Sequence, residues 1–175
     1  MVIYLLLSAL SCSPYQPYYF THYHIIASYD PATTSLSANV QMVFVPGQEC
    51  HDSITFQLNE SVEILSLTSQ ELKYYEFDKG LLVLYIEEAV MKGDQIHISL
   101  TYHGFIGDDP DRGFFLTPDK LWYPLNRGID KLTYSIELEL PEHISLEEPW
   151  IRKGQSWHWN IKKPMAAIAL PKGTE

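Results

Sequence analysis

The sequence predicts an all-β protein, an antiparallel β-sandwich, and three observations support this fold class. Apolar and polar residues alternate with a period of two along most of the chain from residue 22 onward. Turn sequences rich in glycine, proline and aspartate separate the alternating runs at intervals of about ten residues, which is typical of sandwiches. No window combines an apolar stripe of helical period with capping residues; the best helical candidate, Ser66–Tyr75, is weakened by two adjacent tyrosines.

The expected strands follow one another along the chain, and each has one apolar face. Between Ser35 and Phe44, small and large apolar residues alternate with serine, asparagine and glutamine. Such a pattern is typical of an antiparallel strand with one side in the core and the other in solvent. The same pattern predicts strands at residues 54–58, 96–103, 132–140 and 157–161.

Turn chemistry marks the boundaries between these strands. Glycine reaches backbone conformations that other residues avoid, and aspartate and proline favour tight turns. The expected turns are Asp30-Pro31, Pro46-Gly47, Asp78-Lys79-Gly80, Lys92-Gly93-Asp94 and Lys153-Gly154.

The N-terminal segment differs from the rest and predicts export. Met1–Leu10 is uncharged and apolar, but shorter than the roughly 20 residues that a membrane-spanning helix needs. Ala9-Leu10-Ser11-Cys12 resembles a bacterial lipobox, in which the cysteine is acylated, so Cys12 is the lipidation candidate; a Cys12–Cys50 disulfide is the alternative. We therefore expect a signal peptide or lipoprotein signal at 1–12, a tether at 13–20 and a single β-sandwich domain at 21–175, in the periplasm, on the outer surface or outside the cell.

The charge balance excludes one class of partner. Twelve Lys and Arg against 22 Asp and Glu leave a formal net charge of −10. Nucleic acid binding requires clustered cations, so no nucleic acid partner is expected. A membrane is expected as a partner only through a lipid anchor at Cys12.

The chain lacks the motifs of a complete catalytic centre. It contains no His-Glu-x-x-His zinc motif and no nucleophile-elbow or phosphate-loop sequence. His22 and His24 fall on one face of a strand, but a catalytic zinc needs a third ligand that no nearby residue supplies. The acidic run Asp108–Asp111 lacks the closing glutamate of a calcium loop and is expected to be solvated. We therefore predict a non-enzymatic chain without metal or cofactor of its own.

Taken in order, several segments resemble the N-terminal β-sandwich domain of the aminopeptidase N family of zinc metallopeptidases. The resemblance extends from about residue 20 to about residue 172. It is carried by the segments His24–Pro31, Ser35–Val40, Ile54–Asn59, Val62–Leu67, Gly93-Asp94, Leu100–Gly104, Trp122-Tyr123-Pro124, Leu132–Ile136, Pro141, Trp157-His158-Trp159 and Pro164.

This resemblance implies a saddle-shaped sandwich that packs on a thermolysin-like catalytic domain, in cis or in trans, and helps to wall its substrate cavity. In that family the zinc ion, its ligands and the general base belong to the following domain, so a longer parent chain would be a zinc metallo-aminopeptidase with peptide substrates. The family's N-terminal domain also supplies a Gln or Glu that binds the substrate α-amine. At the corresponding distance before Tyr123-Pro124 this chain has Arg112, Gly113 and Phe114, so no amine-binding residue is assigned.

The irregular segment from Phe105 to Arg127 is rich in aromatic residues and is expected to be a compact loop. Its aromatic residues predict a substrate or partner surface at Phe114, Phe115, Trp122 and Tyr123. As the alternative function, these side chains would make the chain an exported binding module for a peptide or glycan, unless they seal the core or a domain interface instead. For a catalytic partner, the expected docking surface is an apolar patch near Trp122 and Trp150.

Overall fold

The computed structural model describes residues 18–30, 32–46, 53–106, 114–116, 120–126, 133–146, 149–161 and 168–170, and their regular structure is β-strand, as predicted. No helix among these residues has the length and apolar character needed to cross a membrane. The strands are β1 (Tyr18–Asp30), β2 (Ser35–Pro46), β3 (Ser53–Gln57), β4 (Val62–Thr68), β5 (Leu72–Asp78), β6 (Leu81–Ile86), β7 (Ile96–Phe105), β8 (Phe114–Leu116), β9 (Tyr134–Glu139), β10 (Ile151–Lys153), β11 (Ser156–Ile161) and β12 (Ile168–Leu170).

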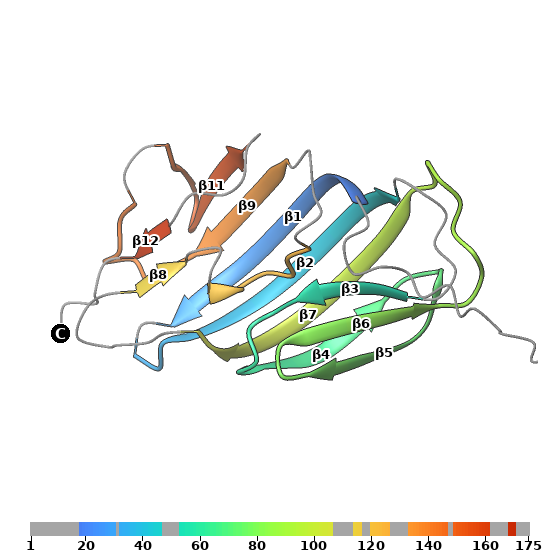
Figure 1. The fold of residues 1–175 in the computed structure, drawn as a ribbon. Helices are drawn as coiled ribbons and strands as arrows, with labels where there is room; N and C mark the ends of the chain where they lie inside the picture. The colour runs from blue at the N-terminus through green and yellow to red at the C-terminus, as the bar shows by residue number, and fades with distance from the viewer. Residues whose placement is uncertain are drawn as a thin grey trace, which may run out of the picture.

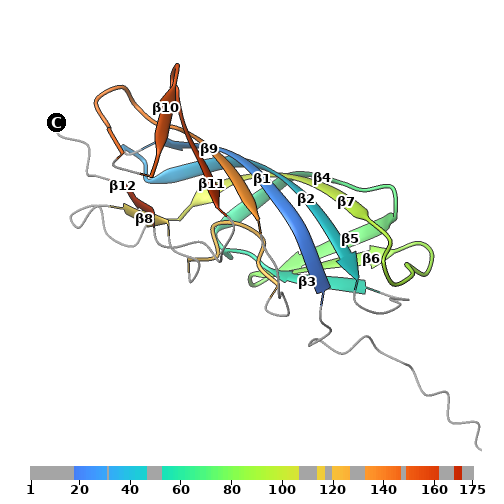
Figure 2. The same ribbon diagram turned by 90° about the horizontal axis from the view of Figure 1, so that it is seen from above.

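The strands form two main layers (Figure 1). A seven-stranded sheet has the order β10-β11-β9-β1-β2-β7-β4, and a three-stranded sheet has the order β3-β6-β5. The small sheet covers the part of the large sheet that contains β2, β7 and β4, while β11 and β10 lie at the opposite end (Figure 2). A further pair, β12-β8, lies near that end, so the predicted sandwich is confirmed.

The large sheet is mixed rather than wholly antiparallel. β1 pairs with β9 in parallel, with Tyr23 opposite Tyr134 and Ser28 opposite Glu139. The other described pairings of this sheet are antiparallel. Parallel pairing of β1 and β9 needs a long connection, and most of the chain between them forms the rest of the sandwich.

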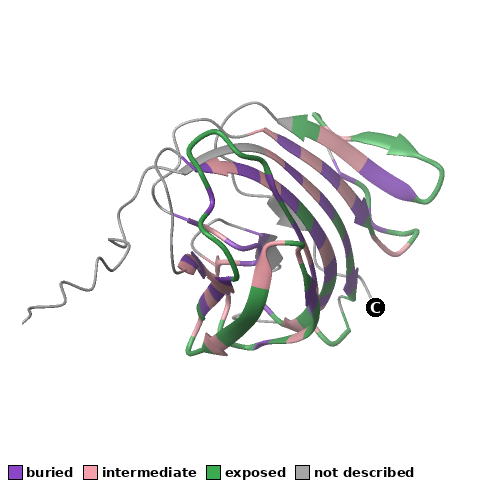
Figure 3. Ribbon diagram, turned by 90° about the vertical axis from the view of Figure 1, so that its right-hand side faces the viewer, coloured by how far each residue is buried: buried purple, intermediate pink, exposed green. Residues whose placement is uncertain are grey.

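The alternation predicted for the long strands is present in three dimensions. In β2, Leu36 through Phe44 are buried at every second position, and the residues between them are half-buried or exposed. Figure 3 shows the same alternation along the long strands of the large sheet. The inward side chains face the small sheet, where the rings of Phe44 and Phe56 lie 6.3 Å apart.

Two boundaries differ from expectation. β1 begins at Tyr18, so Tyr18–Phe20, assigned to the tether from the sequence, belong to a strand paired with the end of β2. The weak helical candidate Ser66–Tyr75 is instead the end of β4, a bend and the start of β5. Cross-strand pairing with β7 and β6 satisfies its backbone and overrides local helix propensity.

The expected turns at Lys79-Gly80, Gly93 and Gly154 are confirmed. Lys79 and Gly80 have φ values of 47° and 79°, the two consecutive positive values of a tight hairpin turn, and they join β5 to β6. Gly93 and Gly154 also have positive φ, 95° and 63°.

Candidate functional site

The segment Lys120–Asn126 lies beside β3, over the inner face of the large sheet (Figure 1), and is held there by backbone hydrogen bonds. Gln57 and Leu125 exchange a pair of backbone bonds at 2.7 and 2.8 Å, so the segment continues the small sheet beyond β3. Asn59 adds a bond from its backbone N–H to the carbonyl of Leu121, at 2.8 Å, and one from its side-chain amide to the carbonyl of Lys120, at 2.9 Å. This irregular segment is therefore part of the core, as expected of a compact loop.

Tyrosine hydroxyls of the large sheet hold the same segment from the other side. Tyr23 on β1 donates to the carbonyl of Pro124 at 2.8 Å, and Tyr102 on β7 donates to the carbonyl of Trp122. Burial raises the pKa of both phenols, so both remain protonated donors. The ring of Tyr123 packs edge-on against Tyr23, at 5.8 Å, and against Tyr134, at 5.7 Å.

The burial of Trp122 and Tyr123 corrects the prediction for two of the four aromatic residues expected at a substrate or partner surface. Trp122 is 0% and Tyr123 is 2% exposed, so neither side chain can contact a ligand or partner of this chain directly. They seal the core: the carbonyl of Trp122 accepts from Tyr102 and the hydroxyl of Tyr123 lies 3.4 Å from that of Tyr134, while the buried indole N–H of Trp122 has no hydrogen-bond partner among the described residues. Phe114 and Phe115 lie in β8, paired with Leu170 and Ala169 of β12, and their side chains lie outside the described part.

Three tryptophans gather at the far end of the large sheet. Trp157 and Trp159 on β11 are opposite Leu138 and Ile136, so they share the core face of β9. Trp150 packs against Trp159, with ring centroids 5.3 Å apart, and both are only half-buried. The small sheet does not reach this end (Figure 1), so the core face carries partly exposed aromatic surface here.

Arg152 on the neighbouring strand β10 lies opposite Trp157 and completes this surface, which we call the tryptophan edge: Trp150, Arg152, Trp157 and Trp159. Ile151, by contrast, lies opposite His158 and points to the other face of the sheet; it is 62% exposed, the largest value among the exposed large apolar residues of the described part. The guanidinium carbon of Arg152 lies 5.8 Å from the ring centre of Trp157, a cation–π contact. Trp150 and Trp159 thus remain partly exposed, so docking near Trp150 stays a prediction, whereas Trp122 lies in the interior.

Histidines gather on the opposite, outer face of the large sheet. His22 and His24 point outward from β1, as their spacing predicted, because Tyr23 between them is buried. His97 and His103 on β7 and His158 on β11 share this face. In the part of the chain that the structure describes, no group of three or more His, Cys, Asp or Glu is placed to hold a metal ion.

Among these histidines, His22 has a side-chain hydrogen-bond partner at close range. Its Nδ1 lies 3.0 Å from the hydroxyl oxygen of Thr133. Burial, and to a smaller degree the neighbouring His24, lowers the pKa of His22 below 6.5, so its neutral form dominates at neutral pH. His103 and His158 lie 3.7 Å from Glu63 and 3.9 Å from Glu137, as ion pairs only when protonated.

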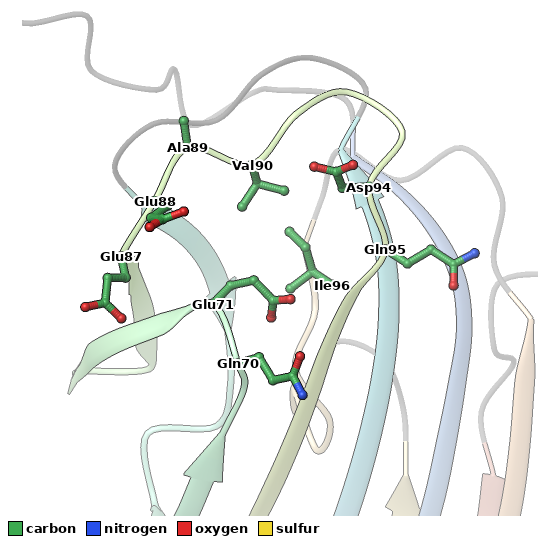
Figure 4. A pocket seen from close by; sticks show the side chains of 9 residues that line it. All are labelled: Gln70, Glu71, Glu87, Glu88, Ala89, Val90, Asp94, Gln95 and Ile96. Carbon is green, nitrogen blue, oxygen red and sulfur yellow. The ribbon is translucent and has the colours of Figure 1, made fainter.

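An acidic hollow opens at the end of the sandwich where the two sheets diverge (Figure 4). It has a volume of about 490 Å³ and lies between the β4–β5 bend and the β6–β7 connection. Glu71, Glu87, Glu88 and Asp94 line it, above buried Val90 and Ile96. No sequence pattern points to this hollow, because its acids come from segments that only the pairing of the sheets brings together.

The remaining sequence predictions fall on residues outside the described part. These are the lipidation candidate Cys12 with its alternative partner Cys50, the acidic run Asp108–Asp111, and the region Arg112–Gly113 next to Phe114.

Several solved structures that resemble this chain are metallopeptidases of one kind. The chain matches a mutant of the M1 zinc metallopeptidase from Deinococcus radiodurans bound to a Tyr-Ser-Ala substrate, with a TM-score of 0.64 and 13% identity. It matches another structure of the enzyme from that organism at a TM-score of 0.63 and 12% identity, and a two-domain M1 zinc metallopeptidase mutant bound to L-arginine at 0.63 and 13%. Each match covers 83% of this chain and 39% of the other.

Sequence comparison adds no relative. No family model matches the chain, and no curated protein matches it significantly. The resemblance predicted from the strand order is thus confirmed at the level of the fold, and this chain spans well under half of the length of the metallopeptidases that share it.

Proposed function

We propose that this chain is the N-terminal β-sandwich domain of an aminopeptidase N-type zinc metallopeptidase, which packs on a catalytic domain and helps to wall its substrate cavity. The observation that carries the proposal is the fold match to M1 zinc metallopeptidases, which covers 83% of this chain but only 39% of theirs. A domain that corresponds to part of a peptidase requires the rest of that peptidase as its partner.

The tryptophan edge supplies the docking surface. Trp150 and Trp159 lie on the core face of the large sheet, yet the small sheet leaves them half-exposed. Aromatic residues and arginine are enriched at the centres of protein interfaces, where burial of their large surfaces provides most of the binding energy. A catalytic domain that packs here would bury the parts of Trp150 and Trp159 that the sandwich leaves exposed.

Catalysis belongs to the partner in this proposal. The zinc ion and its ligands would lie in the catalytic domain, and the sandwich would contribute surface rather than reacting groups.

Reconstitution tests the proposal. The partner is the polypeptide with a His-Glu-x-x-His motif encoded next to this chain, either in the same reading frame or in a neighbouring gene. We expect the two purified parts to associate, and hydrolysis of amino-acid anilides to require that motif. Hydrolysis by the 175-residue chain alone with zinc, or a catalytic part whose stability and activity are indifferent to the chain, would overturn the proposal.

A matched pair of variants locates the interface. Trp150→Ser removes a half-buried ring from the tryptophan edge, whereas Ile151→Ser removes an exposed apolar side chain from the opposite face of the same edge, where Ile151 lies opposite His158. We expect Trp150→Ser to weaken association about tenfold, as truncation of an interface side chain commonly does, and Ile151→Ser to leave it unchanged. Equal effects of the two substitutions would place the interface elsewhere.

We further propose that the chain is exported and lipid-anchored at Cys12. The apolar segment Met1–Leu10 and the lipobox-like Ala9–Cys12 support this. Metabolic labelling with an alkyne fatty acid should mark the natural protein, and Cys12→Ser should abolish the label. An unlabelled, cytoplasmic protein would refute the assignment.

A further inference from the structure

The edge of β7 next to the acidic hollow is left open by its neighbour. β2 pairs with β7 along the whole length of β7, as far as the pair Phe44–Ile96. On the other side, the pairing with β4 ends at Thr68 opposite Ser99. Ile96–Ile98 therefore have one paired neighbour among the described residues, although the strand continues through them.

An open strand edge is a template for one more strand. In an antiparallel sheet, alternate residues direct their backbone N–H and C=O groups to each side. Along Ile96–Ile98, beyond the end of β4, the backbone N–H and C=O groups on that side of β7 have no partner strand among the described residues. An extended peptide can bind these groups by strand addition.

Hollows lie on both faces of this open edge. On the core face, Asp94 and Ile96 line the acidic hollow; on the outer face, His97 and Ser99 line a second hollow of about 520 Å³. Gln70 and Glu71 line both, because the chain bends away from β7 there (Figure 4). Since side chains of a strand alternate between faces, an added strand would place successive side chains in the two hollows in turn.

The negative charge of the core-face hollow favours a peptide with basic side chains. Glu71, Glu87, Glu88 and Asp94 line the core-face hollow. Among the described residues no Lys or Arg lines either hollow; Lys92 belongs to the same loop but does not line them. The floor, Val90 and Ile96, is apolar and buried. A Lys or Arg side chain fits this arrangement, because its aliphatic stem can cover the floor while its charge reaches the carboxylates.

The outer-face hollow suits a different side chain. Its walls include Gln41, Thr68 and His97, and it has no carboxylate other than Glu71. Small polar or β-branched side chains match these walls and favour the extended conformation.

We propose that the open edge of β7 binds an extended peptide by strand addition, with Lys or Arg at alternate positions facing the acidic hollow. The site is independent of the proposed assembly at the tryptophan edge, which lies at the other end of the large sheet. The open edge Ile96–Ile98 is about 10 Å long at roughly 3.3 Å per residue, so a heptapeptide can pair with all of it and extend past its ends.

Fluorescence anisotropy with the full 175-residue chain tests the site. The probe is a fluorescein-labelled heptapeptide of alternating Lys and Thr. One control peptide has Glu in place of Lys, and a second carries N-methyl groups on alternate backbone nitrogens, which removes the donors that strand addition needs. We expect binding of the first peptide alone, and weaker binding as salt screens the carboxylates.

Matched protein variants separate the local site from net charge. E71Q/E87Q/E88Q removes three lining carboxylates, and E60Q/D78N/E142Q removes three exposed carboxylates that do not line the hollows. We expect about tenfold weaker peptide binding for the first variant and little change for the second. The same circular dichroism spectrum and urea midpoint for both would show that both are folded.

Four outcomes would overturn the proposal: no binding, equal binding of the glutamate peptide, equal binding of the N-methylated peptide, and equal losses in the two triple variants. Analytical ultracentrifugation supplies a fifth. If the chain alone dimerises and E71Q/E87Q/E88Q alters that equilibrium, the edge belongs to a second copy rather than to a basic peptide.

Discussion

The hydroxyl of Tyr23 donates a hydrogen bond to the carbonyl oxygen of Pro124 at 2.8 Å, although the two residues are 101 positions apart. This contact joins β1 of the large sheet to the segment Lys120–Asn126, which also pairs with β3 of the small sheet. The two layers are therefore connected by polar bonds through a buried irregular segment as well as by apolar packing.

Tyr23→Phe is expected to destabilise the chain by about 1–3 kcal/mol, because the buried carbonyl of Pro124 loses its donor while the ring packing is kept. Urea unfolding followed by circular dichroism measures the change. Tyr85→Phe is the control, since the hydroxyl of Tyr85 bonds the exposed Glu76 at 3.0 Å and its loss should cost much less. Equal costs would mean that the Tyr23–Pro124 bond does not stabilise the core.

Trp122→Ala is expected to cost about 3–5 kcal/mol, because a fully buried indole leaves a large cavity when truncated. If the change prevents folding, Trp122→Phe should still fold with a smaller loss. The burial itself is measurable by acrylamide quenching: Trp122→Phe should remove a component of the fluorescence that the quencher does not reach. Loss of a readily quenched component would place Trp122 at the surface and restore it as a ligand-binding residue.

Gly104→Ala is expected to destabilise β7 by about 1–3 kcal/mol, as overpacking does. An added Cβ would lie 2.5 Å from the carbonyl oxygen of Ser61 and 2.6 Å from the Cα of Val62, and both are backbone atoms of the β4 side that cannot move aside independently. Gly154→Asn is the comparison, because its φ of 63° is tolerated by asparagine and no atom lies within 4 Å of an added Cβ. Thermal unfolding should therefore separate the two substitutions clearly.

Acidification is expected to destabilise the chain through His22. Its pKa in the folded state lies below the ordinary value of 6.5, chiefly through burial and secondly through His24. The unfolded state therefore binds its proton first, so this contribution is complete above pH 6.5 and is lost as the pH falls through the lowered folded pKa. His22→Gln should flatten the dependence of the urea midpoint on pH in that window, and an NMR titration in which His22 titrates above pH 6.5 would contradict the explanation.

Much of the fold follows from local alternation. The strand predicted at Ser35–Phe44 is β2, and the strands predicted at 54–58, 96–103 and 157–161 correspond to β3, β7 and β11. Side-chain direction in a strand has a period of two, so the order of residues alone determines which side of each strand is apolar. For the same reason the outward direction of His22 and His24 could be predicted, and the positive-φ turn at Lys79-Gly80 follows from its composition.

Only the tertiary structure decided which strands meet and which irregular residues are buried. The parallel pairing of β1 with β9, the burial of Trp122 and Tyr123, and the convergence of Glu71, Glu87 and Asp94 depend on contacts between segments distant in the chain. An alternating pattern specifies a face but no partner, and an irregular segment has no period from which burial can be deduced. Its position is set by bonds such as those of Gln57 and Tyr23, which exist only once the sheets have packed together.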